Sequence, residues 1–131
     1  MSIGVLILAH EQIGAALLQT AARVLGSVPL PARSLTVAFD CNCEQVLSEA
    51  ARLIDQLDSG AGVLVLTDMY GSTPANLARA LKDDHRVCVL TGVNLPMLLR
   101  IFNYPQLSLA EIAAKAEQGG RDGVFICGDC E

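Results

Sequence analysis

The stretch Ile3-Gly4-Val5-Leu6-Ile7-Leu8-Ala9-His10 decides how the rest of the chain is read. The residues before the histidine are aliphatic or small, which is typical of a strand that is buried on both faces in the middle of a parallel sheet. The run stops at a single histidine, and a helical pattern follows at once. In open α/β sheets, ligands bind just beyond the carboxyl ends of strands, where the strand order reverses. His10 is therefore a candidate functional residue, although a histidine can also stand at a strand end simply because the chain surfaces there.

Working outward from this stretch, helical and extended patterns alternate along the chain. Apolar spacing predicts helices over 13–25, 46–57, 73–81, 94–102 and 108–119, the last one stopping at Gly119-Gly120, and further strands over 35–39, 63–67 and 86–90. This alternation predicts an α/β fold, with a doubly wound, mostly parallel sheet of four to five strands and helices on both faces. A short fifth strand is allowed at Val124-Phe125-Ile126.

The polarity of the strands predicts their order. The strands over 3–9 and 63–67 are apolar throughout, so they should be central and adjacent. In the second strand, Leu35, Val37 and Phe39 alternate with more polar or smaller residues, which indicates one drier face and a place nearer the edge. The expected order is 2-1-3-4, with the switch point between strands one and three.

Length and charge limit the classes of protein. With 131 residues, the chain is expected to form a single domain over 1–131. Its net charge of −5 and the absence of a Lys/Arg cluster argue against nucleic acid and anionic membranes as partners. No apolar run reaches the ~18 residues of a membrane span, and a signal-peptide pattern is absent. We therefore expect a cytoplasmic protein without direct membrane insertion.

A second candidate residue follows the second apolar strand. Asp68 comes directly after Thr67, so it should face His10 across the switch point. A carboxylate on one imidazole nitrogen fixes the tautomer and leaves the other nitrogen as a nucleophile. The segment Gly71-Ser72-Thr73 then leads into a helix, with Thr73 as the expected N-cap and Pro74 at the first helical position. A helix N-terminus binds anions, so these residues are candidates to hold a phosphoryl group, unless Asp68 and Thr73 serve only as caps.

The combination favours phosphoryl transfer through a histidine. The sequence has no Walker motif, no kinase glycine-rich loop and no pair of magnesium-binding carboxylates. The phosphoryl donor is therefore expected to be another phosphoprotein rather than a nucleotide, and no cofactor or metal is expected.

Three segments give the chain a specific resemblance: the strand ending in Ala9-His10, the run Thr67–Asn76 (TDMYGSTPAN), and the run Val89–Leu98 (VLTGVNLPML). With these, the chain resembles the enzyme IIA component of the mannose family of the bacterial phosphoenolpyruvate-dependent sugar phosphotransferase system. The resemblance implies that His10 accepts a phosphoryl group from the phosphocarrier protein HPr and passes it to an enzyme IIB. It also implies that Asp68 is the partner of His10 and that the protein forms a homodimer.

One position departs from this resemblance, and alternatives stay open. The family usually has a small residue, often glycine, after the histidine, where this chain has Glu11. A carboxylate there would repel a phosphoryl group unless it points away. The phosphotransfer subunit of dihydroxyacetone kinase has a similar fold and histidine. A regulatory module that binds partners according to its phosphorylation state, without sugar transport, is another alternative.

The cysteines allow one more alternative, a thiol or metal-binding protein. Cys41 and Cys43 form one close pair and Cys127 and Cys130 another, so four thiolates would hold zinc if the end of the chain folded back beside the second strand. The spacings are short and common, and in a chain without a secretory signal free thiols are the simpler expectation. The other histidine, His85, lies in a charged turn and is expected to be solvated.

Overall fold

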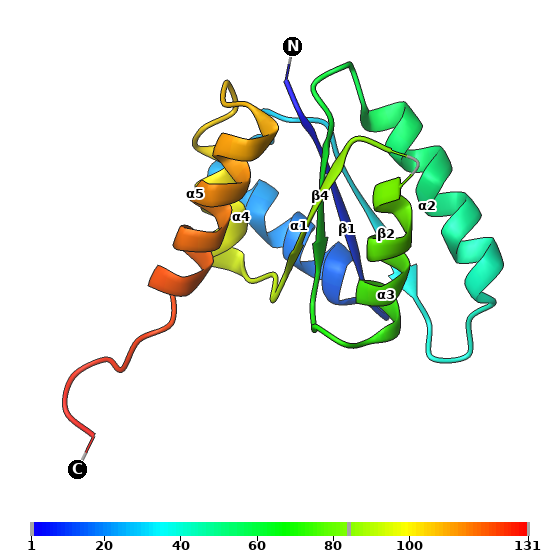
Figure 1. Ribbon diagram of the computed structural model, residues 1–131. Helices are drawn as coiled ribbons and strands as arrows, with labels where there is room; N and C mark the ends of the chain where they lie inside the picture. The colour runs from blue at the N-terminus through cyan, green and yellow to red at the C-terminus, as the bar shows by residue number, and fades with distance from the viewer. Residues whose placement is uncertain (1, 84, 131) are drawn as a thin grey trace.

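The computed structural model describes residues 2–83 and 85–130, and it has the expected α/β architecture. Parallel strands form a single sheet in the order β2-β1-β3-β4, and helices cover both of its faces (Figure 1). The predicted order 2-1-3-4 is confirmed. The elements are β1 (Gly4–His10), α1 (Ile13–Leu25), β2 (Ala32–Val37), α2 (Cys43–Leu57), β3 (Val63–Thr67), α3 (Thr73–Ala80), the 3-10 turn η1 (Leu81–Asp83), β4 (Val87–Thr91), α4 (Leu95–Phe102) and α5 (Leu109–Asp122).

The central strand β1 sends alternate side chains to two separate cores. Val5 and Ile7 pack with α1, α4 and α5 on one face, while Leu6 and Leu8 pack with α2 and α3 on the other. Residues 5–8 are fully buried, which is why the run that opens the sequence is apolar without alternation. The two layers hold β1 firmly, so the position of its carboxyl end is fixed by packing on both sides.

The second strand lies two to three residues earlier in the chain than its alternation predicted, over Ala32–Val37. β2 ends at Val37, which pairs with His10 at the end of β1, so the sheet offers no partner beyond that point. Phe39, expected to continue the strand, instead lies in the following loop with 83% of its surface exposed. The chain turns there, and the Cys41 N–H donates to the Ala38 carbonyl at 3.1 Å.

The last helix is longer than the sequence predicted. α5 passes through Gly119 and Gly120 and ends only at Asp122. Both glycines are buried against α4: a Cβ on Gly119 would lie 2.6 Å from the Cβ of Arg100, and one on Gly120 would lie 2.8 Å from Cε of Met97. These glycines therefore serve close packing of two helices and do not end the helix.

The short fifth strand is absent from the described part of the chain. Residues 123–130 leave α5 as an extended segment directed away from the body (Figure 1), and Val124, Phe125 and Ile126 are each about three quarters exposed. None of the helices in residues 2–83 and 85–130 combines the length and the apolar character needed to cross a membrane.

Candidate functional site

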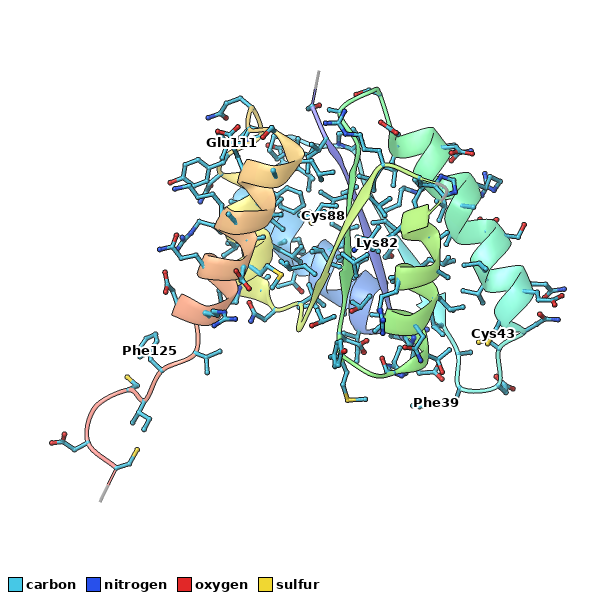
Figure 2. All side chains as sticks on the ribbon, in the orientation of Figure 1. Phe39, Cys43, Lys82, Cys88, Glu111 and Phe125 are labelled. Atoms are coloured by element: carbon cyan, nitrogen blue, oxygen red, sulfur yellow. The ribbon has the colours of Figure 1, made fainter. Side chains whose placement is uncertain are left out.

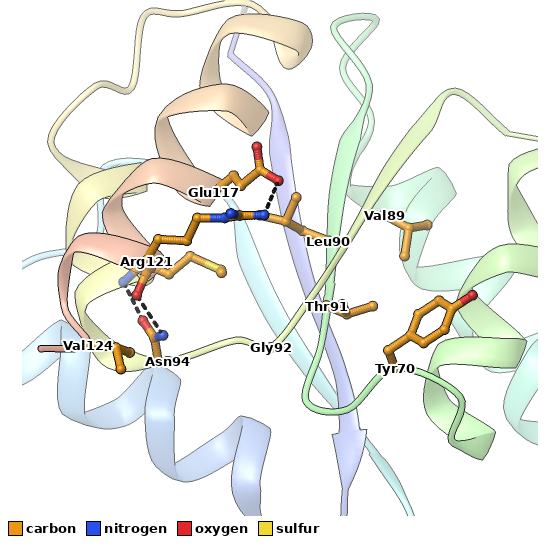
Figure 3. A pocket seen from close by; sticks show the side chains of 11 residues that line it. Tyr70, Val89, Leu90, Thr91, Gly92, Asn94, Glu117, Arg121 and Val124 are labelled. Atoms are coloured by element: carbon orange, nitrogen blue, oxygen red, sulfur yellow. Dashed lines mark hydrogen bonds and ion pairs between the residues drawn. The ribbon is translucent and has the colours of Figure 1, made fainter.

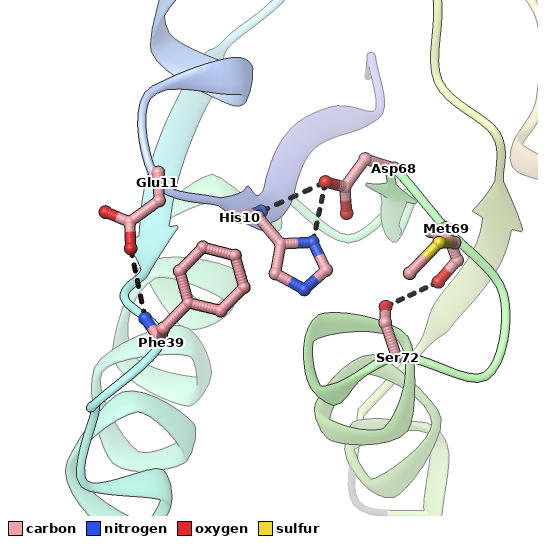
Figure 4. A network of polar contacts seen from close by, with 6 residues as sticks. All are labelled: His10, Glu11, Phe39, Asp68, Met69 and Ser72. Carbon is pink, nitrogen blue, oxygen red and sulfur yellow. Dashed lines mark hydrogen bonds and ion pairs between the residues drawn. The ribbon is translucent and has the colours of Figure 1, made fainter.

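The structure brings His10 and Asp68 into contact at the carboxyl edge of the sheet. His10 is the last residue of β1, and Asp68 follows β3, the strand paired with β1. Nδ1 of His10 lies 2.8 Å from Oδ2 of Asp68, and the backbone N–H of His10 donates to the same oxygen at 3.2 Å (Figure 4). The exposed fractions of the two side chains are only 17% and 12%, so water screens the pair weakly.

This contact determines which imidazole nitrogen is free. An ionised carboxylate only accepts hydrogen bonds, so the shared hydrogen belongs to Nδ1 of His10. In the neutral ring, the lone pair then lies on Nε2, which is the nitrogen available as a nucleophile. The pair can therefore present a neutral, oriented imidazole to a reactant at the surface.

The second oxygen of Asp68 is also informative. Oδ1 is buried and has no hydrogen-bond partner among the described residues. A buried carboxylate with few donors is poorly compensated, so it favours positive charge on the imidazole that contacts it. Asp68 is thus arranged to stabilise a histidine ring that gains charge during a reaction.

The start of α3 differs by one residue from the prediction. Ser72, not Thr73, is the N-cap; the helix begins at Thr73, and Pro74 lies within its first turn. Ser72 is buried, and its hydroxyl donates to the Met69 carbonyl at 2.5 Å instead of capping the helix. This bond closes the loop after Asp68, and Gly71 supports the turn with a φ of +79° that favours glycine.

The first turn of α3 lies beside the histidine. In Figure 4 it sits below the imidazole, on the side of the second ring nitrogen, with Ser72 across from Phe39. Thr73 is exposed at this end of the helix. N–H groups of a first helical turn have no partner within the helix and attract anions. Gly71, Ser72 and Thr73 thus form one loop and helix start near His10 (Figure 4).

Phe39 and Glu11 also surround the histidine; the sequence prediction did not place Phe39 at the site, and it left the direction of the Glu11 carboxylate open. The Phe39 ring stacks on the His10 ring, with centroids 5.4 Å apart and planes tilted by 30°. The Phe39 N–H donates to the carboxylate of Glu11 at 3.1 Å, and Figure 4 shows this carboxylate beyond the phenylalanine ring, seen from the imidazole. Glu11 therefore does not face the free ring nitrogen. The sequence carried no signal for this contact because Phe39 reaches His10 only through the pairing of β1 with β2.

The other histidine is placed differently from its prediction. Nδ1 of His85 lies 3.3 Å from Oδ1 of Asp55, and the side chain of His85 is only 16% exposed. The expectation of a solvated histidine is therefore wrong, because α2 supplies a carboxylate that a turn by itself does not. His85 precedes β4, at the amino end of the parallel sheet, so it lies at the edge opposite to His10.

The two cysteine pairs remain apart. Cys41 and Cys43 stand at the start of α2, whereas Cys127 and Cys130 lie in the extended C-terminal segment, and Figure 2 shows Cys43 and Phe125 on opposite sides of the molecule. Partial burial and the neighbouring Cys43 raise the pKa of the Cys41 thiol. Within residues 2–83 and 85–130, His, Cys, Asp and Glu side chains form no group of three or more that could bind a metal ion. The folding back that a four-thiolate site requires does not occur.

A hollow of about 730 Å³ lies beside the edge strand β4 (Figure 3). Tyr70 borders it from the loop after Asp68, and Val124 borders it from the end of α5. Between them, Arg121 pairs with Glu117 at 3.3 Å, and Asn94 donates to the Gly120 carbonyl at 3.2 Å. The sequence patterns gave no indication of this hollow, because it forms where α5 passes the free edge of β4.

Comparisons with known proteins find relatives of this chain in sequence and in structure. A family model described as PTS system fructose IIA component (EIIA-man) matches residues 4–117. The PTS system mannose-specific EIIAB component of Escherichia coli K12 is 32% identical over 127 residues, covering 95% of this chain and 39% of that protein. The chain thus spans about two fifths of the length of the curated relative it matches.

Solved structures have the same fold. The mannose/sorbose specific IIA subunit of the phosphotransferase system from Enterococcus faecalis superposes with a TM-score of 0.87 at 22% identity, covering 100% of this chain and 98% of that chain. The PTS IIA protein associated with the fucose utilization operon from Streptococcus pneumoniae superposes with a TM-score of 0.79 at 26% identity, covering 96% of this chain and 93% of that chain.

Proposed function

Because the chain belongs to the EIIA-man family of IIA components of the bacterial sugar phosphotransferase system, we propose that it is a phosphocarrier that works through a phosphohistidine. It accepts a phosphoryl group on His10 from HPr and passes it to an enzyme IIB. The observation that carries this proposal is the contact of 2.8 Å between Nδ1 of His10 and the buried Asp68 carboxylate, which leaves Nε2 free.

In the proposed step, Nε2 of neutral His10 attacks the phosphorus of the phosphohistidine of HPr. A new N–P bond forms on His10 while the donor N–P bond breaks, and the electron pair of the broken bond returns to the donor imidazole. The His10 ring keeps its hydrogen on Nδ1 and becomes positively charged, and the Asp68 carboxylate offsets this charge. Transfer to enzyme IIB repeats the exchange with His10 as the donor.

The start of α3 would hold the phosphoryl oxygens. Since the Ser72 hydroxyl already donates to the Met69 carbonyl, we assign this role mainly to the backbone N–H groups of Gly71, Ser72 and Thr73. The macrodipole of α3 adds partial positive charge at this end. Phosphoryl transfer depends mainly on positioning and charge stabilisation, which such a cradle supplies.

The surface around the site fits protein partners. Met69 and Tyr70, in the loop after Asp68, are 58% and 72% exposed. Large apolar side chains that stay exposed beside a reactive group are typical of a docking surface. HPr and enzyme IIB would use this surface in turn, because both must reach the same nitrogen of His10. Both exchanges would take place in the cytoplasm.

A homodimer is the proposed assembly. Val124 and residues of the uncovered edge strand β4 line the hollow at the end of α5, and the side chains of Val124, Phe125 and Ile126 are exposed. Apolar surface and a free strand edge are commonly covered by a second copy with two-fold symmetry. Light scattering should give twice the chain mass at micromolar concentration, and removal of residues 123–131 should give the monomer mass. A monomeric full chain would contradict this assembly.

Reconstitution tests the phosphocarrier function. With phosphoenolpyruvate, enzyme I and HPr, the protein should take up one phosphoryl group, which is lost in acid and retained in base, as expected of a phosphoramidate. Omitting HPr or introducing His10→Ala should abolish labelling. Labelling of the His10→Ala variant would contradict the assignment of the site. Lack of wild-type labelling, in a mixture that labels a known acceptor, would contradict the function.

A further inference from the structure

Glu11 adopts an unusual backbone conformation next to the histidine. Its φ is +44°, and among the described residues it is the only residue other than glycine with a positive φ. A residue with a Cβ is unfavourable in this left-handed region, and it persists there only when surrounding contacts hold it. The conformation of Glu11 must therefore be held by specific contacts with neighbouring residues.

The backbone and the side chain of Glu11 bind the end of β2 and the loop that follows it. The Glu11 N–H donates to the Val37 carbonyl at 3.2 Å, and its carboxylate accepts the Phe39 N–H at 3.1 Å. His10 and Val37 are the last residues that pair between strands β1 and β2. Glu11 thus continues the attachment of the two chain segments beyond the end of the sheet.

The result of this attachment is the position of Phe39. The Phe39 ring lies with its centroid 5.4 Å from that of His10, although 83% of the phenylalanine surface is exposed. Burial in the core therefore does not explain why the side chain is there, and the backbone anchor from Glu11 does. The imidazole is held between the Phe39 ring and the Asp68 carboxylate, and only 17% of its side chain is exposed (Figure 4).

We propose that Glu11 is a positioning residue that anchors Phe39, and that the Phe39 ring holds the His10 imidazole against Asp68 with Nε2 directed outward. The catalytic consequence rests on the proposed phosphocarrier function, whereas the anchoring itself is a property of the free protein. An aromatic face also attracts a positively charged ring, so the contact favours the imidazolium that forms when His10 carries a phosphoryl group. Fixing the orientation of a nucleophile raises the rate because a small misplacement costs much of it.

Proton NMR of the free protein tests the anchoring without any phosphoryl donor. The ring protons of His10, assigned with His10→Ala, should shift when Phe39→Leu removes the aromatic ring current. Glu11→Gly relieves the backbone strain but removes the acceptor, so it should shift the same resonances in the same direction. Glu11→Gln keeps an acceptor oxygen and should stay close to wild type. Phe125→Leu, which changes a similarly exposed phenylalanine in the C-terminal segment, is the matched control and should leave them unchanged.

Single-turnover transfer from phospho-HPr at saturating concentration tests the consequence. Glu11→Gly and Phe39→Leu should lower the rate constant about 10-fold, while Glu11→Gln and Phe39→Tyr should restore most of it. His10 resonances that stay at wild-type positions in Glu11→Gly would overturn the anchoring. If Glu11→Gly and Phe39→Leu both transfer at the wild-type rate, the positioning role is wrong. If the wild type takes up no phosphoryl group, the phosphocarrier function fails, and the NMR comparison still decides whether Glu11 anchors Phe39.

Discussion

A histidine lies beside an aspartate at each end of the parallel strands, one pair at the carboxyl edge and one at the amino edge of the sheet. The two pairs differ in their surroundings. At the carboxyl edge, His10 and Asp68 are 2.8 Å apart, with exposed side-chain fractions of 17% and 12%. At the amino edge, His85 and Asp55 are 3.3 Å apart, and the aspartate is 75% exposed. The histidines are about equally buried, so the difference lies in the carboxylates.

This difference shows what distinguishes the pair that is proposed to react from the other pair. The Asp68 carboxylate is shielded from water and also receives the backbone N–H of His10, so both the tautomer and the direction of the ring are fixed. The Asp55 carboxylate is open to water on α2, where solvent weakens its influence on His85. The loop after Asp68 and the start of α3 also lie beside His10 (Figure 4). The carboxyl edge therefore carries the proposed chemistry, and the amino edge carries structural turns.

The largest expected effect comes from the buried carboxylate. Asp68→Asn should slow phosphorylation of His10 on the order of 100-fold, because an amide can hold the wrong tautomer and no longer offsets the charge of the ring. Asp55→Asn should stay within about twofold, because that carboxylate is screened by water. Rapid-quench measurement with phospho-HPr gives both rates. Equal rates for Asp68→Asn and wild type would remove the distinction between the two edges.

A smaller effect is expected at the turn before β3. Asp58 accepts the N–H groups of Gly60 at 2.8 Å and Gly62 at 3.0 Å, and these bonds lower the pKa of its carboxyl. Asp58→Ala should reduce the free energy of unfolding by about 1–2 kcal/mol at neutral pH. Urea denaturation measures this change, with Asp129→Ala as a control in the exposed C-terminal segment, and the rate of phosphorylation should be unchanged.

The lowered pKa also gives the Asp58 contribution a pH dependence. A folded-state pKa below the unfolded one adds stability above the ordinary aspartate pKa of about 3.9, and this contribution is lost as the pH falls through the folded value. The difference between wild type and Asp58→Ala should therefore be largest at neutral pH and should shrink in acid. A difference that grows in acid would contradict the sign of the shift.

The smallest effect is expected from the second histidine. His85→Ala removes one partner of a polar contact whose carboxylate is exposed, so the free energy of unfolding should change by less than about 1 kcal/mol. Labelling with phospho-HPr should proceed at the wild-type rate. Thermal unfolding and the labelling assay measure the two effects. A large loss of phosphorylation would show that the amino edge contributes to the chemistry.

The site was predictable where it depends on strand ends. His10 and Asp68 each follow an apolar strand directly, and parallel strands bring their carboxyl ends to one edge, so their contact could be expected from the chain order. The roles of Glu11 and Phe39 could not be predicted. Alternation placed Phe39 inside a strand, but β2 ends where β1 ends, and the aromatic ring then stacks on His10.

Tertiary contacts overruled two local signals. Gly119-Gly120 is a typical helix end, yet α5 continues through it because the glycines allow close contact with Arg100 and Met97. A charged turn predicted a solvated His85, yet α2 supplies Asp55 from 30 residues earlier in the chain. Both signals depended on neighbours in space that local patterns do not contain.

The sequence by itself determined the alternation of strands and helices, the strand order, and the pair His10 and Asp68. These features follow from hydrophobic periodicity, which can be read along the chain, and from topology rules that hold for parallel sheets in general. Only the tertiary structure decided the tautomer of His10, the anchoring of Phe39 by Glu11, the course of α5 and the hollow beside β4. Each of these depends on distances of a few ångströms between segments remote in sequence, and such distances are set by packing.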